Sequence, residues 1–364
     1  MQTLQKQPHP VRRTAVAARG WRLPRHRGGV IIAVLLLGIV TLLSIVIGSV
    51  AIPPEIAFKI LLSHIPGIAI IPDWPASFER ILLDIRLPRV ALVAITGATL
   101  ACSGAAYQGL FRNPLADPYL IGVASGAGLG AILAAAIRTT TPDVPLLIIP
   151  FGAFIGAVAT VATVYTLGRI GGVTPITTLL LAGVAIGTLT SAASTFILLR
   201  LSSQTARILA FLLGGYATGG WEPVLTVVPF ALVGFVTLVV CARPLNLILF
   251  DEFQARQLGI DVERLKLLVI IAATLMTAAA VAFSGLVGFA GLIVPHTIRL
   301  LVGADHRRLL PLAALGGATF LLLADLLART LIAPAELPLG VVTAAVGAPF
   351  FLYLLRRAKG ASFF

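Results

Sequence analysis

The sequence predicts an all-α protein that crosses a membrane about ten times. Of its 364 residues, 58% are hydrophobic, and the mean hydropathy is +1.02, well above the values of soluble domains. The apolar residues form continuous runs close to the roughly 20 residues that a helix needs to cross a ~30 Å hydrocarbon core. These runs lack the alternation of a membrane β-barrel, so each span is predicted to be a helix.

Ten apolar runs follow one another along the chain. The run at Gly285–Leu301 is short, and Pro295 is expected to break it, while Ile208–Tyr216 is a candidate for an additional half-helix. Residues 30–357 are therefore expected to form one transmembrane domain, preceded by a basic, disordered cytoplasmic tail at 1–29 that resembles no signal peptide. The predicted spans are 30–50, 90–110, 121–138, 146–169, 177–199, 224–242, 265–283, 287–302, 309–328 and 338–356.

The lysine and arginine residues predict the orientation of these spans. With the tail set inside and ten spans alternating, 19 of the 27 basic residues fall on the inner side. Such a bias marks the cytoplasmic side of membrane proteins, so both termini are expected in the cytoplasm. The formal net charge of +13 is interpreted as this topology signal, and no nucleic-acid partner is predicted.

Glycine recurs at intervals of four residues in three of the predicted spans. The repeats are Gly122, Gly126 and Gly130, then Gly152 and Gly156, then Gly183 and Gly187. Four-residue spacing places these glycines on one face of each helix, where two backbones can approach closely. The repeats predict tight helix packing and say little about a cargo.

No motif in the sequence indicates an enzyme that acts by itself. The patterns GxxxxGK[ST], HExxH and GxSxG are missing, and the five histidines are scattered. Cys102 and Cys241 lie in different spans without the spacing of a metal site or a disulfide framework. Asp325 is the one candidate for an intramembrane coupling group, but it stands four residues before Arg329, which favours a local ion pair. No catalytic residue, metal or cofactor is predicted in this chain.

One dense charged segment, residues 251–266, separates two apolar spans. Seven of its sixteen residues are charged, against 11% in the whole chain. Gly259 can end a short helix in the left-handed conformation, and Asp261 can cap the next helix. The segment is predicted to contact a partner in water; an ordinary solvated loop is the alternative on composition alone.

Two blocks of sequence carry the most specific motifs. The first is IRLPRVALVAITGATLACSGAAYQGLFRNPLADPYLIGVASGAGLG; the second comprises GLVGFAGLIVPHTIRLLVGADHRRLLP, LLLADLLART and APAELPLGVVTAAVGAPFFLYLLRR. Together they resemble the FecCD-like permease subunits of type II ATP-binding-cassette importers, which take up iron-siderophore complexes, haem and cobalamin. The resemblance covers about residues 30–357.

The resemblance implies a permease of the bacterial inner membrane that works as a homodimer by alternating access. ATP and Mg²⁺ would bind to two separate ATPase subunits, and an extracytoplasmic binding protein would deliver the cargo. The expected order of cargoes is ferric siderophore, haem, then cobalamin. A secondary transporter of a small solute is the alternative, disfavoured by the scarcity of charge at mid-membrane, and an intramembrane enzyme is disfavoured by the lack of a nucleophile and base.

The resemblance also assigns three groups of residues to roles. For docking of the binding protein they are Arg86, Arg89 and Arg329, since guanidinium groups bind carboxylates in a bidentate way; anchoring of Arg86 and Arg89 at the membrane interface is the alternative. For coupling to the ATPase they are Ala255, Arg256, Gln257, Leu258, Gly259, Ile260 and Asp261. For a cytoplasmic gate they are Thr174, Pro175, Ile176, Thr177 and Thr178, although this stretch is less rich in hydroxyl groups than in the cobalamin importer.

The loop Phe111–Pro118 between the second and third spans contains two prolines and an Asn-Pro pair. Such a composition favours a tight connection. Asn113 and Asp117 are therefore interpreted as turn formers in a cytoplasmic hinge, not as ligands.

Overall fold

The computed structural model describes residues 27–358, apart from 49, 68–69, 142, 202–204 and 216–218. Most of the predicted tail, residues 1–26, therefore lies outside the described residues. The described chain is helical, with one isolated bridge between Ile170 and Val173. Its helices are α1 (Arg27–Val46), α2 (Pro54–Ser63), α3 (Ala76–Arg80), the π-helical η1 (Ile81–Arg86), α4 (Leu87–Leu110), the 3-10 helix η2 (Pro118–Ile121), α5 (Val123–Thr140), α6 (Ile148–Gly168), α7 (Ile176–Leu198), α8 (Thr205–Leu212), α9 (Glu222–Phe250), α10 (Glu252–Gln257), α11 (Val262–Ser284), α12 (Ala290–Val302), α13 (His306–Thr330) and α14 (Leu339–Ala358).

The predicted fold class is confirmed. Among the described residues, eight helical stretches are long and apolar enough to cross a membrane: α1, the continuous α3–η1–α4, α5, α6, α7, α9, α11 and α13. The shorter apolar helices α12 and α14 account for the two remaining predicted runs. The ten apolar runs of the sequence therefore correspond to ten apolar helical stretches.

Several boundaries differ from the prediction; α9, for example, continues to Phe250 instead of ending at residue 242. The second span begins at Ala76 instead of residue 90, because α3 continues through the π-helical turn of η1 into α4 without a break. In the eighth run the break precedes Pro295, which lies inside α12. Residues 285–289 form an irregular connection with positive φ at Gly285 (+71°) and Phe289 (+67°), a conformation that ends a helix.

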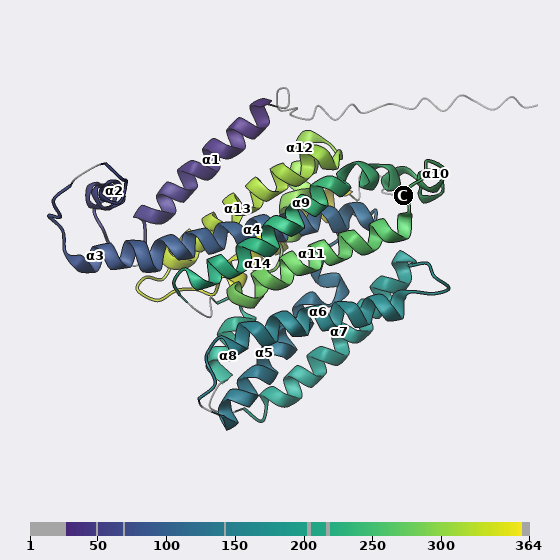
Figure 1. The fold of residues 1–364 in the computed structure, drawn as a ribbon, viewed down its shortest axis with the longest axis horizontal. Coiled ribbons are helices and arrows are strands. Elements are labelled where there is room, and N and C mark those ends of the chain that lie inside the picture. The colour runs from purple at the N-terminus through teal and green to yellow at the C-terminus, as the bar shows by residue number, and fades with distance from the viewer. Residues whose placement is uncertain are drawn as a thin grey trace, which may run out of the picture.

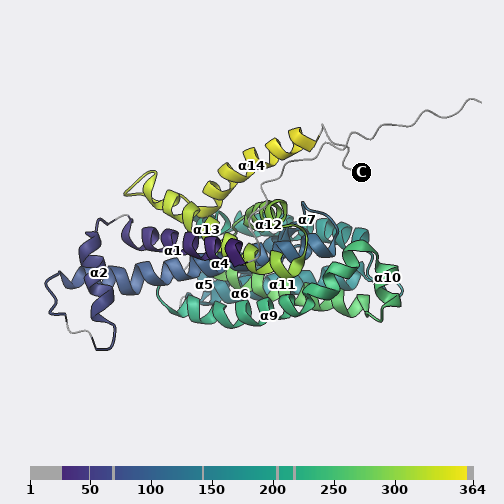
Figure 2. The same ribbon diagram turned by 90° about the horizontal axis from the view of Figure 1, so that it is seen from above.

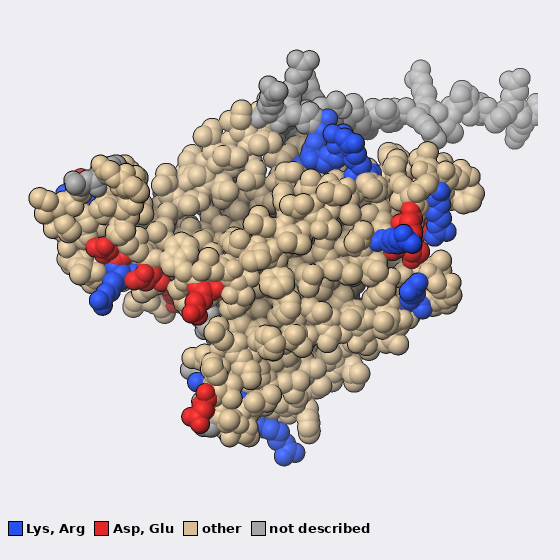
Figure 3. Space-filling model, viewed as in Figure 1, with Lys and Arg blue, Asp and Glu red and all other residues tan. Residues whose placement is uncertain are grey.

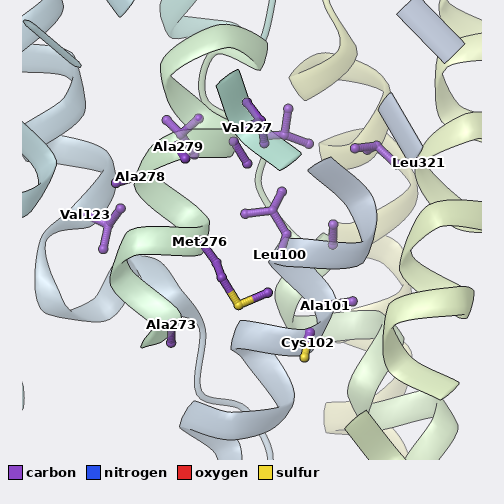
Figure 4. Close-up of a cluster of buried hydrophobic side chains, with 14 of the residues drawn as sticks. Leu100, Ala101, Cys102, Val123, Val227, Ala273, Met276, Ala278, Ala279 and Leu321 are labelled. Carbon is purple, nitrogen blue, oxygen red and sulfur yellow. The ribbon is translucent and has the colours of Figure 1, made fainter. Parts of the chain in front are cut away.

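The helix α4 occupies the centre of the molecule and packs along α9, α11, α12 and α13 (Figure 1). The core between these helices is built from small and branched apolar side chains, including Leu100 and Cys102 of α4, Met276 of α11 and Leu321 of α13 (Figure 4). The helices α2 and α3 lie at one end of the long bundle and α10 at the other, while α14 leans away from it (Figures 1 and 2).

The glycine repeats bring α5 and α6 into backbone contact, as predicted. A Cβ atom added to Gly130 would collide with the carbonyl oxygen of Gly152, and one added to Gly126 would collide with that of Gly156. Between α5 and α6 the two helices therefore pack through faces without side chains. The same kind of contact joins α4 to α13 at Gly97 and Gly317.

The charges are distributed as expected for a protein in a membrane. In the view of Figure 3 the middle of the molecule is almost free of Lys, Arg, Asp and Glu, which gather towards the ends of the long helices. Exposed side chains over the middle are apolar, such as Leu35 of α1 and Val240 of α9. Lipid is the solvent that suits such a surface.

Candidate functional site

The charged segment 251–266, called here the coupling segment, forms a helical corner at one end of the molecule (Figure 1). Asp251 begins α10 by accepting a hydrogen bond from the amide of Phe253 at 2.7 Å. Gly259 has φ +82° and turns the chain after α10. Asp261 then caps α11 by accepting from the amide of Arg264 at 3.0 Å. The two residues that the sequence singled out, Gly259 and Asp261, thus have the predicted geometry.

The coupling segment exposes large apolar side chains beyond the ends of the apolar helices. Phe253 is 66% exposed and Leu258 is 68% exposed, and Phe250 at the end of α9 is 84% exposed. Leu258 is one of the seven residues expected to contact the ATPase. Of the remaining six, Ala255 is buried and Ile260 is half-buried, and the exposed ones are Arg256, Gln257, Gly259 and Asp261. Exposed apolar groups in a charged segment are typical of a protein-binding surface.

A cluster of charged side chains lies beneath this surface. The side chain of Lys266 is 5% exposed, and its ammonium group lies 3.1 Å from Glu252 Oε2 and 3.2 Å from Glu263 Oε1. Arg112, beyond the end of α4, and Arg256 of α10 approach Glu252 at 3.8 and 3.9 Å. These contacts tie together the start of α10, the start of α11 and the chain after α4.

The expected gate residues lie at the start of α7, next to this cluster. Thr174 is buried, with its amide donating to Glu263 Oε2 at 2.8 Å and its carbonyl accepting from Lys266 at 3.1 Å. Pro175 precedes the first residue of α7, Ile176. Thr177 is exposed and Thr178 is half-buried. Of the predicted group, Thr174 is the residue whose hydrogen bonds join it to the charged cluster.

Two of the three predicted docking arginines are inside the protein. Arg86 is 5% exposed and Arg329 is 3% exposed. Arg86 donates to the carbonyls of Ile45, Val46 and Val50, and Arg329 donates to those of Ser44 and Ile47. The carbonyls at a helix C-terminus have no intrahelical donors, and the arginines supply them at the end of α1. In this structure the two groups bind the protein's own backbone, and their role in docking stays a prediction.

The third docking arginine, Arg89, joins a buried carboxylate to the surface. It donates to Asp325 Oδ1 at 2.9 Å and to Glu336 Oε2 at 2.7 Å, with 24% of its side chain exposed. Arg329 completes the group with an ion pair to Asp325 at 2.8 Å, which confirms the pair that the i, i+4 spacing predicted. Asp325 thus lies between two guanidinium groups and is fully buried.

The loop after α4 forms the predicted turns. Asn113 Oδ1 accepts from the amide of Leu115 at 2.9 Å, and Asp117 Oδ1 accepts from the amide of Tyr119 at 2.8 Å. Burial raises the pKa of the Asp117 carboxyl to about 6, against the opposing effect of the Tyr119 hydrogen bond. Both side chains therefore act as turn formers.

The roles of some residues of the charged cluster were not predicted from the sequence. Lys266 falls within the predicted span 265–283, where a basic residue is unusual and could have been noticed. Glu263 and Lys266 also have the i, i+3 spacing of a helical ion pair. Their contacts with Thr174 join positions about 90 residues apart, for which one sequence carries no local signal.

Metal ligands do not gather anywhere in the described part of the chain: no three His, Cys, Asp or Glu residues are placed to hold an ion. Cys102 and Cys241 are both buried and free. The candidate sites therefore consist of contact surfaces and the charged groups that position them.

Comparison with known proteins places this arrangement in a family. Residues 35–357 match the model of the FecCD transport family. The chain is 45% identical over 282 residues to the cobalamin import system permease BtuC of Halobacterium salinarum, covering 78% of this chain and 75% of that protein. It is 44% identical over 284 residues to the hemin transport system permease HmuU of Yersinia pestis, covering 77% and 84%. A solved structure described as a metal-chelate type ABC transporter in an inward-facing conformation is 32% identical, with a TM-score of 0.77 and coverage of 91% and 99%.

Proposed function

Since the chain belongs to the FecCD transport family of ABC importer permeases, we propose that it moves a metal chelate into the cytoplasm by alternating access. The energy comes from ATP hydrolysed on a separate pair of ATPase subunits. The protein is located in the inner membrane of a bacterium, with both termini in the cytoplasm. The expected order of cargoes is ferric siderophore, haem, then cobalamin.

The observation that carries this proposal is the apolar surface of the coupling segment. Phe253 and Leu258 are exposed on a short helix that ends at Gly259, and the sequence contains no GxxxxGK[ST] motif of its own. Burying two such side chains in a partner contributes about 1.5–3 kcal/mol each. The partner we propose is a separate ATPase, which would bind the nucleotide and contact Phe253 and Leu258.

The cargo assignment draws on what the relatives carry. The names of two relatives specify hemin and cobalamin, and the related solved structure is of metal-chelate type. These cargoes share a metal ion enclosed by a large organic ligand. A pathway for such complexes needs width and weak binding rather than a tight site, which agrees with the scarcity of charged side chains along the middle of the helices.

For the extracytoplasmic binding protein we propose Arg89 as the contact residue of the three expected arginines. Its guanidinium reaches the surface, where it pairs with the exposed Glu336 at 2.7 Å. A carboxylate of the binding protein can replace Glu336 as the partner of Arg89, since exposed ion pairs are weak. Arg86 and Arg329 act indirectly, by fixing the end of α1 beside this surface.

Reconstitution tests the proposal. The purified permease is placed in proteoliposomes with its ATPase subunits and binding protein, and uptake of labelled ferric siderophore, haem and cobalamin is measured. We expect uptake that requires ATP and persists when an ionophore removes the proton gradient. A secondary transporter, the alternative, would instead take up its solute on a gradient without the ATPase, and that result would contradict the proposal.

The buried Asp325 is the residue on which a gradient-driven mechanism would have to depend. It lies between Arg89 and Arg329 at 2.9 and 2.8 Å, so its charge is compensated by two arginines. A carboxylate held in this way favours a structural role over proton or ion exchange.

A further inference from the structure

The most complete buried polar contact in the coupling segment is made by Lys266. Its ammonium group has three acceptors: Glu252 Oε2 at 3.1 Å, Glu263 Oε1 at 3.2 Å and the carbonyl of Thr174 at 3.1 Å. An ammonium donates three hydrogen bonds, so all of its donors are used. Because an unpaired charge at a buried site is strongly unfavourable, these three acceptors are held close to Lys266 together.

Two side chains of α11 hold both backbone groups of Thr174. Lys266 binds its carbonyl, and Glu263 Oε2 accepts its amide hydrogen at 2.8 Å. The next residue, Pro175, provides no side-chain cap for α7 and has no amide hydrogen of its own. The backbone immediately before α7 is therefore held by the first turns of α11, while α7 itself packs against α5, α6 and η2.

Glu252 connects the same lysine to α10. It is the first residue of α10 and is the only residue of that helix that contacts Lys266 among the ion pairs found in the described chain. Displacing α10 must either carry Lys266 along or separate Glu252 from it. Separation would leave a buried charge uncompensated, so concerted movement is favoured.

We propose that Lys266, together with Glu252 and Glu263, transmits the movement of α10 to the cytoplasmic end of α7. These residues are positioning residues: they touch neither cargo nor nucleotide, and they act through the backbone of Thr174. The inference rests on the proposed function, because it presumes that an ATPase moves α10. It goes beyond that function because it names the side chains that link movement of the ATPase to movement of the gate at the start of α7.

The neighbouring ion pair of the same segment connects no other helix to α11. Arg264 and Asp261 pair at 2.8 Å, but their side chains are 85% and 52% exposed. Exposed pairs of this kind contribute little, and this one closes within the first turn of α11. The burial of Lys266 and its bond to Thr174 are what distinguish it.

Lys266→Met is the variant that removes the charge and keeps the length of the side chain. Lys59→Met is the matched control, since Lys59 of α2 has a side chain that is 44% exposed and pairs with Asp73, and α2 lies at the opposite end of the molecule from α10 (Figure 1). Each variant is reconstituted with the ATPase subunits and the binding protein, and cargo uptake and ATP hydrolysis are measured in the same vesicles. We expect uptake per ATP hydrolysed to fall at least tenfold for Lys266→Met, with unchanged ATPase binding, and to stay at the wild-type value for Lys59→Met.

The movement of α7 can be observed directly with a spin label at the exposed position Thr177. The native cysteines, Cys102 and Cys241, are both buried, so a Thr177→Cys variant can be labelled selectively. The distance between the labels of two copies is measured by pulsed electron paramagnetic resonance with and without ATP. We expect the distance to respond to ATP in the otherwise wild-type complex and to stop responding when Lys266→Met is added.

The outcomes separate this inference from the proposed function. A wild-type ratio of uptake to hydrolysis and a wild-type distance response in Lys266→Met overturn the inference alone. Loss of ATPase binding in proportion to loss of uptake also overturns it, because the cluster would then only support folding. If Lys266→Met does not fold, Glu252→Gln, at a side chain that is 26% exposed, is measured in the same way. Failure of the wild-type complex to import any of the three chelates with ATP would count against the proposed function itself.

Discussion

The arginines at the end of α1 illustrate how the same residue type serves two different purposes. Arg86 and Arg329 were expected to bind an acidic partner, yet both are buried against carbonyls of residues 44–50. The sequence predicts that Arg86 and Arg329 lie on the same side of the membrane, and it cannot reveal that α1 ends beside them. The contact joins residues separated by 282 and 285 positions in the case of Arg329, so it depends on the tertiary fold.

The first prediction concerns Arg329. Replacing it with methionine removes one of the two cations beside Asp325 and takes a donor from the carbonyls of Ser44 and Ile47 at the end of α1. Breaking a buried ion pair by removing one partner typically costs about 3–5 kcal/mol. Thermal unfolding of the detergent-solubilised protein should therefore occur at a clearly lower temperature. Arg80→Met is the control, because Arg80 is an exposed residue of α3; an equal shift in both variants would contradict the structural role.

The second prediction concerns pH and Asp117. Burial raises the pKa of this carboxyl from 3.8 to about 6, so the folded protein binds a proton more tightly than the unfolded chain does. The corresponding stability is fully present below about pH 4 and is lost as pH rises through about 6. Between pH 5 and pH 7.5 the melting temperature should therefore fall. In Asp117→Asn, which can still cap η2, this part of the pH dependence should disappear; an unchanged slope would show that other groups cause it.

At the scale of helices, the sequence predicts packing better than it predicts breaks. The spacing of glycines on α5 and α6 indicates the contact that the structure contains, because a four-residue repeat selects a face. The prediction that Pro295 breaks the eighth run is wrong, because proline is tolerated within a helix when neighbouring helices support it. The actual break depends on the left-handed conformation of Phe289, a side chain that lies against Gly347 of α14. No local pattern signals a conformation that a distant glycine permits.

The third prediction tests the glycine contact between α5 and α6. An alanine at Gly130 would place its Cβ against the carbonyl of Gly152, and overpacking of this kind usually costs about 1–3 kcal/mol. Gly38→Ala is the matched control: Gly38 lies within α1, and an added Cβ there meets no atom within 4 Å. We expect a lower melting temperature for Gly130→Ala and an equal or slightly higher one for Gly38→Ala. Equal effects of the two substitutions would argue against tight packing at Gly130.

The fourth prediction tests the corner between α10 and α11. Gly259 has φ +82°, and an added Cβ would meet no atom within 4 Å, so any effect of substitution comes from the backbone alone. Valine is strained in this conformation, whereas asparagine tolerates it. Gly259→Val should therefore tilt α10 and lower cargo uptake per ATP hydrolysed severalfold in proteoliposomes, while Gly259→Asn should keep it. Full uptake with the valine variant would contradict a coupling role for this corner.

For the whole molecule, the distribution of exposed side chains distinguishes α7 from α1. The helix α7 is the least buried span: only 11% of its most apolar window is buried within the chain. Three hydroxyl side chains, Thr188, Ser191 and Thr195, are exposed along it at i, i+3 and i+7 spacing, which places them on one face. The large side chains that α1 exposes, by contrast, are all apolar, as expected for contact with lipid. A homodimer with its transport pathway beside α7 would explain both the hydroxyl groups on α7 and the apolar surface of α1. Of these two surfaces, only that of α1 could be interpreted from the composition of the sequence.

The last prediction distinguishes a pathway from lipid by access of water. A cysteine at Thr188 should react with a charged, water-soluble thiol reagent in the assembled transporter, because a pathway between two copies of α7 must admit water in at least one state. A cysteine at Leu35, which is 61% exposed on α1, should react slowly, since thiolate forms poorly in hydrocarbon and the charged reagent is excluded from it. The buried native cysteines keep the background low. Addition of ATP should change the rate at Thr188→Cys and leave that at Leu35→Cys unaltered, because the proposed alternating access would open and close the pathway without moving the lipid-facing surface. Equal, ATP-independent rates at the two positions would place α7 in lipid and require a different interface between the two copies.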